Sequence, residues 1–125
     1  MLIASERDAG ALDAAIADDD DVAIAAITAA ELLVGIELAD KKRRRARASF
    51  VDDLLKDLPV QDYGLATARA HARLLALTRR AGRPRGAHDL IIAATALESN
   101  RIVVTADARG FADLPGVTVR ALGTT

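Results

Sequence analysis

Apolar residues recur along the chain with two different spacings, and these spacings predict the order of its elements. β-branched residues that alternate with alanine predict a mostly buried strand at 22–27. Apolar residues three and four positions apart predict amphipathic helices. Further strands are expected at 60–63, 101–105 and 117–122, and helices at 8–17, at 28–38, from the basic residues 41–47 to Leu58, at 65–82 and at 89–99.

Residues with known positional preferences mark several helix ends. Thr28 and Glu31 have the S/T-x-x-E spacing of a capping box, which predicts that a helix begins at Thr28. Pro59 predicts the end of the helix that runs from the basic residues 41–47 to Leu58. The segment GRPRGAH is expected to be a loop because of its Gly and Pro content, and the next helix is expected to open at Asp89.

Short apolar strands that alternate with helices predict a single α/β domain over residues 1–125. We expect a three-layer α/β/α sandwich with a mostly parallel central sheet. Ligands of such sheets bind at the carboxyl ends of the strands. Glu31 follows one predicted strand, Asp107 follows another, and Asp89 opens the helix that precedes the second. These three acids are therefore the candidate site residues.

Composition and charge narrow the classes of function. The absence of cysteine excludes disulfide frameworks, thiolate zinc sites and cysteine nucleophiles. Two phenylalanines, one tyrosine and no tryptophan exclude an aromatic platform for stacking bases. The apolar stretches are shorter than about 18 residues, so no membrane span is expected. The start of the chain lacks the basic region of a signal peptide. We therefore expect a cytoplasmic protein with no membrane partner.

The formal net charge of −1 conceals two blocks of like charge. The acidic run 18–21 is expected to be a solvated turn, and the basic block 41–47 is either a solvated helical face or an RNA footprint. Four arginines that approach the Asp89 helix could contact phosphates or be structural. They are Arg79, Arg80, Arg83 and Arg85.

Three carboxylates at one edge of a sheet form an oxygen-ligand set suited to Mg²⁺ or Mn²⁺. One or two such ions would polarise a phosphodiester, orient a water and offset charge on the leaving oxygen. Without a cation the cluster is costly, because neighbouring like charges disfavour mutual ionisation. The sequence therefore predicts metal-assisted phosphodiester hydrolysis.

The segments TAAELLVGIELA, HDLIIAATALE and IVVTADARGF resemble the three acidic motifs of PIN-domain ribonucleases, in particular the VapC-type toxins of bacterial type II toxin–antitoxin pairs. The resemblance extends over nearly the whole chain and includes the trailing ADLPGVTV. It implies that Glu31, Asp89 and Asp107 bind Mg²⁺, with Mn²⁺ as a substitute, in a sequence-selective endoribonuclease. It also implies a homodimer that is inhibited by a cognate VapB-type antitoxin.

The chain departs from the family pattern at two places. The family's first acid lies in a segment resembling D-T-S-x-L-I-A, whereas this chain begins M-L-I-A, where that segment should be ending. We hypothesise a start site assigned a few codons too late; the other explanation is a weakened chain that binds antitoxin or RNA without cleaving it. Glu6 and Asp8 lie beyond the motif and are poor replacements. Gly110 stands where many relatives carry an acid or a polar residue.

Each candidate also has a purely structural interpretation. Glu31 could be a capping-box residue, Asp89 a helix-start acid, and Asp107 a turn aspartate bonded to its own backbone. Thr105 is expected to position Asp107 or a water through its hydroxyl. Of the two histidines, His71 is expected to be structural or on the surface, and His88 is expected near the site without a catalytic role.

Overall fold

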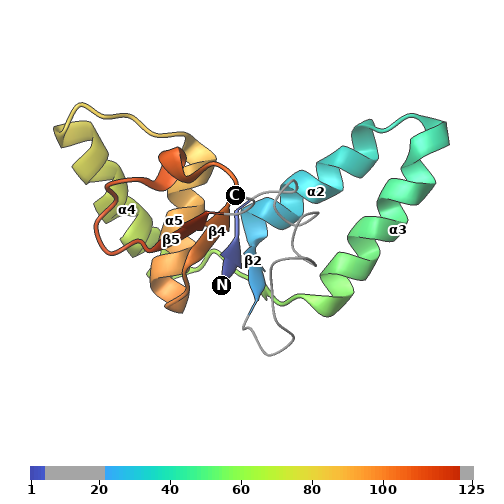
Figure 1. Cartoon of the computed structure of the whole chain (residues 1–125), viewed down its shortest axis with the longest axis horizontal. Coiled ribbons are helices and arrows are strands. Elements are labelled where there is room, and N and C mark those ends of the chain that lie inside the picture. The colour runs from blue at the N-terminus through green and yellow to red at the C-terminus, as the bar shows by residue number, and fades with distance from the viewer. Residues whose placement is uncertain (5–21, 122–125) are drawn as a thin grey trace.

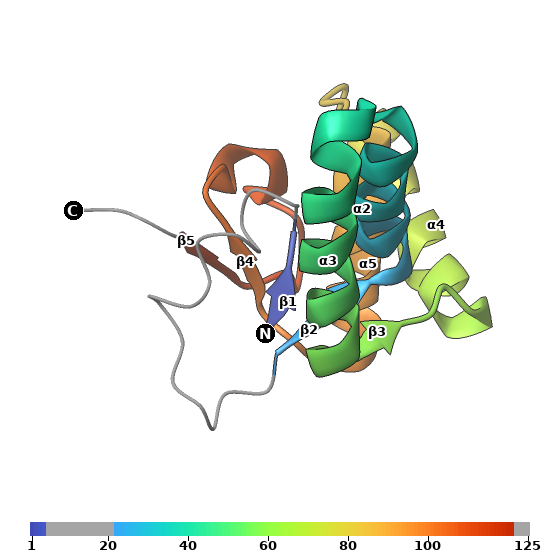
Figure 2. The same ribbon diagram turned by 90° about the vertical axis from the view of Figure 1, so that its right-hand side faces the viewer.

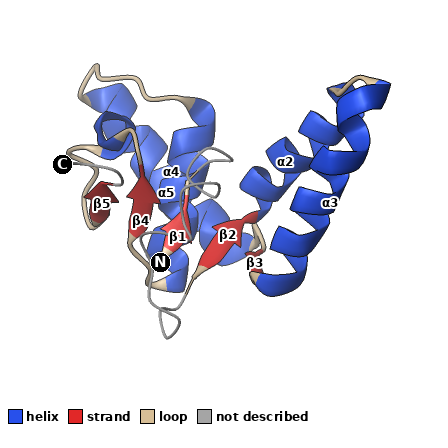
Figure 3. Ribbon diagram, turned by 45° about the vertical axis from the view of Figure 1, so that its right-hand side comes forward, coloured by secondary structure: helices blue, strands red, loops and turns tan. Residues whose placement is uncertain are grey.

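The computed structural model describes residues 1–4 and 22–121, and its strands form one parallel sheet. The strand order is β3-β2-β1-β4-β5 (Figure 3). The strands are β1 (Leu2–Ile3), β2 (Ala23–Ala25), β3 (Val60–Gln61), β4 (Val103–Thr105) and β5 (Val119–Ala121). The helices are α2 (Ala26–Leu38), α3 (Lys41–Asp57), α4 (Leu65–Arg80), α5 (Ala87–Ser99) and the 3₁₀ helix η2 (Ala108–Phe111).

Helices cover both faces of the sheet, because successive strand residues point to opposite sides. Leu2 and Ala23 belong to a core cluster with residues of α4 and α5. Ile3 and Ile24 belong to a second cluster with Ala29 and Leu32 of α2 and Val51 of α3. Figure 1 shows these helix pairs on either side of the strands, and Figure 2 shows α3 in front of α5. The predicted three-layer α/β/α arrangement is confirmed.

The central strand is the short segment at the start of the chain. Leu2 pairs with Ala23 on one side and with Val103 on the other. Both residues of β1 are fully buried, because the strand is covered on its two edges and its two faces. The segment expected to be the end of the first strand is thus β1, and Ala4 is the residue directly after it.

The capping box predicted at Thr28 is wrong. Helix α2 begins two residues earlier, at Ala26, directly after β2, and its N-cap residue Ala25 makes no side-chain cap bond. Thr28 lies inside the first turn, fully buried, and its hydroxyl donates to the Ala4 carbonyl oxygen at 3.4 Å. Thr28 therefore ties α2 to the end of β1, and Glu31 has no capping role.

Other predicted boundaries differ from the observed ones by a few residues. Helix α5 begins at Ala87, so Asp89 lies within its first turn rather than at its start. Helix α3 begins after Asp40, whose side chain accepts a hydrogen bond from the Arg43 backbone N–H at 2.9 Å. The predicted helix 8–17 and the acidic run 18–21 lie outside the described residues. Within the described part of the chain, no helix is long and apolar enough to cross a membrane.

Candidate active site

The three candidate acids come from three elements at the carboxyl edge of the sheet. Glu31 lies on α2 after β2, Asp107 follows β4, and Asp89 lies in the first turn of α5. The pKa of Asp89 is raised, first by burial of the carboxyl group and then by the charges of Asp107 and Glu31. Asp107 and Glu31 therefore both lie close enough to Asp89 for their charges to act on its carboxyl group.

Glu31 is held by a histidine from the opposite helical layer. Its Oε1 lies 2.5 Å from Nδ1 of His88, and the side chains are 35% and 58% exposed respectively. His88 directly precedes Asp89 in α5, so this contact joins the part of α2 that carries Glu31 to the turn that carries Asp89. The expectation that His88 lies near the candidate acids is confirmed.

The Asp89 carboxylate packs against two glycines. A Cβ atom at Gly86 would lie 3.4 Å from its Oδ2, and one at Gly110 would lie 2.6 Å from the same atom. The second distance is shorter than nonbonded contacts of real Cβ atoms. The absence of a side chain at Gly110, a departure from the family pattern, therefore makes room for this carboxylate.

Asp107 is positioned through its backbone. Its N–H donates to Oγ1 of the buried Thr105 at 3.0 Å. Its side chain is 72% exposed, with Oδ1 at 3.8 Å from Nε of Arg109. The contact expected between the Thr105 hydroxyl and Asp107 is thus present, and the Asp107 N–H donates to this hydroxyl rather than to the Asp107 carboxylate.

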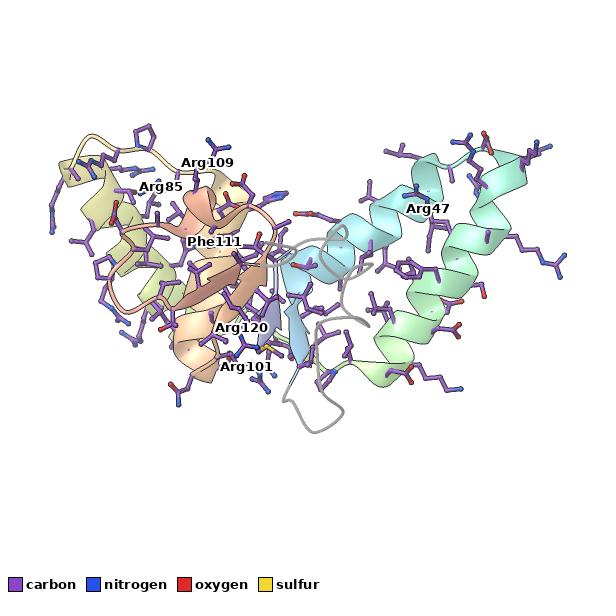
Figure 4. All side chains as sticks on the ribbon, in the orientation of Figure 1. Arg47, Arg85, Arg101, Arg109, Phe111 and Arg120 are labelled. Atoms are coloured by element: carbon purple, nitrogen blue, oxygen red, sulfur yellow. The ribbon has the colours of Figure 1, made fainter. Side chains whose placement is uncertain are left out.

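The segment that follows Asp107 is anchored by Arg85. Its guanidinium donates to the Ala112 carbonyl oxygen at 2.6 Å and to the Arg109 carbonyl oxygen at 3.4 Å. Figure 4 shows Arg85 and Arg109 near each other, with Phe111 beneath them; Phe111 is 3% exposed. Arg85, a candidate phosphate contact by sequence, is therefore engaged in holding η2 and the residues after it.

The donor set of the site fits a hard divalent cation. All three candidate ligands are carboxylates, and like-charged oxygens at one place favour Mg²⁺ or Mn²⁺ over zinc. Within residues 1–4 and 22–121, no three or more acidic, histidine or cysteine side chains lie close enough together, as they stand, to hold a metal ion. Glu31 and Asp107 are instead engaged by His88 and Arg109. The residues present fit the ion in chemistry: Asp107 would have to leave Arg109, whereas Glu31 could keep its bond to His88 because a carboxylate has a second oxygen.

The PIN domain family matches residues 1–117, a range that includes all three acids. The chain belongs to the PIN domain family, among its VapC-type members. A Ribonuclease VapC from Rickettsia bellii is 28% identical to this PIN domain over 101 residues, which are 80% of this chain and 75% of that protein.

Solved structures agree with this membership. VapBC-5 from Mycobacterium tuberculosis, a member of the VapBC family of toxin–antitoxin systems, has a TM-score of 0.76 at 31% identity, over 96% of this chain and 94% of that chain. DNA-bound VapBC from Salmonella typhimurium has a TM-score of 0.74 at 29% identity, over 80% and 74% of the two chains. These proteins are similar to this PIN domain in sequence as well as in fold.

Two features of this PIN domain had no signal in its sequence. The bond between His88 and Glu31 joins residues from helices in different layers, and the contact of Gly110 with Asp89 joins η2 to α5. The structural interpretation of His71 is supported, because its Nδ1 lies 2.8 Å from the Tyr63 hydroxyl and the two rings meet edge to face.

Proposed function

We propose that this PIN domain is a Mg²⁺-dependent endoribonuclease, the toxin of a type II toxin–antitoxin pair, and that Mn²⁺ can replace Mg²⁺. The observation that carries the proposal is that Glu31, Asp89 and Asp107 meet at the carboxyl edge of the sheet in a chain that the PIN domain family matches over residues 1–117. Burial and the neighbouring charges of Asp107 and Glu31 raise the pKa of Asp89. A cluster of carboxylates that repel one another is stabilised by a divalent cation. Bound there, the cation supplies Lewis-acid stabilisation of the charge that develops during phosphodiester hydrolysis.

Each proposed metal ligand is positioned by a different contact. His88 holds Glu31, the backbone around Gly110 confines Asp89, and Thr105 holds the backbone of Asp107. The ion pair between Asp107 and Arg109 is almost fully exposed. Such pairs contribute little to stability, so Asp107 can turn from Arg109 toward a cation at small cost.

The proposed partners follow from the relatives. The similar structures from Mycobacterium tuberculosis and Salmonella typhimurium are VapBC structures, which supports a cognate VapB-type antitoxin for this chain. Its substrate is RNA, as the name of the Rickettsia bellii relative indicates for that protein. We further propose that residues 1–125 act as one domain, in a homodimer and in the cytoplasm.

Cleavage of a purified tRNA pool tests this function. The chain should cut RNA in Mg²⁺ or Mn²⁺ and should lose the activity in EDTA. Asp89→Asn keeps the shape of the side chain but removes its charge, so this variant should be inactive and folded. Full activity of Asp89→Asn, or cleavage that EDTA leaves unchanged, would contradict the assignment.

A second candidate function is a module that binds antitoxin or RNA without cleaving it. The observation that favours it is that Leu2–Ala4, which form β1 and the position after it, carry no carboxylate. The same assay distinguishes the two, when it includes a version with an Asp-bearing segment restored before Met1. RNA cleavage by the chain itself supports the enzyme. Cleavage by the extended version alone indicates an impaired nuclease, and the absence of cleavage by both supports the binding module.

A further inference from the structure

We propose that His88 is a positioning residue that holds Glu31 in its metal-binding orientation, so that His88 governs the affinity of the site for a divalent cation. The inference rests on the proposed function, because it concerns the ligands of the same site. It adds a residue that acts through Glu31 and does not itself bind the metal.

The geometry of the contact carries the inference. Nδ1 of His88 and Oε1 of Glu31 are 2.5 Å apart, which is a short hydrogen-bond distance. The Nδ1–H donates and the carboxylate oxygen accepts. A carboxylate has two oxygens, and this bond engages one of them. The other, Oε2, would remain available to hold a cation, and the bond from the imidazole restricts the rotation of the carboxylate.

The position of His88 couples it to two proposed ligands at once. Helices α2 and α5 pack on opposite faces of the sheet, and the side chains of Glu31 and His88 meet beyond its edge. His88 is also the residue before Asp89 on the first turn of α5. A bond from His88 to Glu31 therefore sets the placement of Glu31 relative to Asp89, which is the relationship on which shared coordination depends.

A flexible glutamate gains most from such support. Its side chain loses rotamer entropy when it is ordered, and a bond that orders it beforehand removes part of this cost from metal binding. Groups that orient metal ligands in this way typically change affinity by about 10- to 100-fold when they are removed. The loss of affinity on removal of the His88 donor is expected at the lower end of this range, because the side chains of His88 and Glu31 are both partly exposed.

The choice of variants separates the donor from the bulk of the ring. Asparagine places its Nδ2 donor at the same branch position as Nδ1 of histidine, whereas leucine keeps a side chain of similar reach without any donor. The matched control is His71→Leu, because the described partner of His71 is Tyr63. Far-UV circular dichroism and thermal unfolding establish that each variant is folded.

The measurement is the dissociation constant for Mn²⁺, followed by electron paramagnetic resonance of the free ion. We expect His88→Leu to weaken binding about tenfold. His88→Asn should stay within about threefold of the parent, and His71→Leu should equal it. The inference would be overturned if His88→Leu bound Mn²⁺ as tightly as the parent, if His88→Asn were no better than His88→Leu, or if nitrogen couplings showed the imidazole bound to the ion.

Asp89→Asn separates a failure of this inference from a failure of the proposed function. If Asp89→Asn abolishes Mn²⁺ binding while His88→Leu leaves it unchanged, the metal site stands and the role of His88 is wrong. If the parent binds no Mn²⁺, or if Asp89→Asn binds it as well as the parent does, the metal site itself is wrong and the role of His88 fails with it.

Discussion

Gly110 and Asp89 are packed so closely that no side chain fits between them. A Cβ atom added at Gly110 would lie 2.6 Å from Oδ2 of Asp89 and 3.3 Å from its Cγ. The nearest atom is the far end of a flexible side chain, so the carboxylate would turn away and the backbone would stay in place. The orientation of Asp89 thus depends on the glycine in η2.

Gly110→Ala should therefore reduce RNA cleavage about 10- to 100-fold, because misplacement of a reacting group by about 1 Å has effects of this size. The free energy of unfolding should change by less than about 1 kcal/mol, since removal of a glycine also restricts the unfolded chain. The matched control is Gly64→Ala, where an added Cβ meets nothing within 4 Å. Cleavage by Gly110→Ala at the parent rate would show that the orientation of Asp89 is unimportant.

The raised pKa of Asp89 makes stability depend on pH. Burial and the charges of Asp107 and Glu31 place the folded-state pKa above the ordinary value of 3.8. Protonation therefore favours the folded state: this contribution is fully present below about pH 3.8 and is lost as the pH rises through the raised pKa.

Asp89→Asn should accordingly be more stable than the parent at neutral pH. The expected gain is about 0.2–1 kcal/mol, the range of partly exposed charge interactions, and it should vanish below about pH 3.8. Urea denaturation across this pH range measures the difference. Mg²⁺ should raise the melting temperature of the parent more than that of the variant. If Asp89→Asn were less stable than the parent at pH 7, repulsion of Asp89 by Asp107 and Glu31 would be contradicted.

Thr105→Val should leave the Asp107 backbone N–H without its hydroxyl acceptor. The bond is 3.0 Å long and Thr105 is only 4% exposed. We expect a loss of about 1 kcal/mol in the free energy of unfolding and a lower cleavage rate, because Asp107 loses its positioning contact. Thr105→Ser retains the hydroxyl and should recover most of the cleavage rate. If valine and serine behaved alike, the hydroxyl would have no role in the site.

Arg85→Ala should loosen the segment that follows Asp107. The substitution removes the bonds to the carbonyl oxygens of Arg109 and Ala112. A cost of about 1–3 kcal/mol is expected for hydrogen bonds from a charged group, and hydrogen exchange should accelerate in 106–112. Arg79→Ala, at an exposed position of α4, is the comparison that removes equal charge. Equal stability of the two variants would refute the anchoring role of Arg85.

The order of elements was predictable because apolar spacing is a local property. The strand after residue 22 and the helix that carries Asp89 were each recognised from a few neighbouring positions. The capping-box prediction at Thr28 failed because the same T-x-x-E spacing occurs when the threonine lies within the first helical turn. The local spacing cannot show that the Thr28 hydroxyl is buried and bonded to the distant Ala4 carbonyl oxygen.

The candidate acids could be placed at one edge of the sheet by the rule for parallel strands. The contacts of each acid could not be predicted in this way, because the partner residues come from elsewhere in the chain. His88 was expected near the site but not as the partner of Glu31. Gly110 looked like the loss of a polar group, whereas its missing side chain is what accommodates Asp89.

The proposed nuclease site is tested most directly by comparing RNA cleavage by Glu31→Gln, Asp89→Asn and Asp107→Asn in Mg²⁺. Asp52→Asn on the exposed face of α3 is the control, since it removes one carboxylate of the same kind. Each of the three variants should lose at least about 100-fold in rate, as expected for groups that act together on the transition state, while the control stays within about twofold of the parent. Cleavage at the parent rate by the three variants would show that these carboxylates do not form the nuclease site.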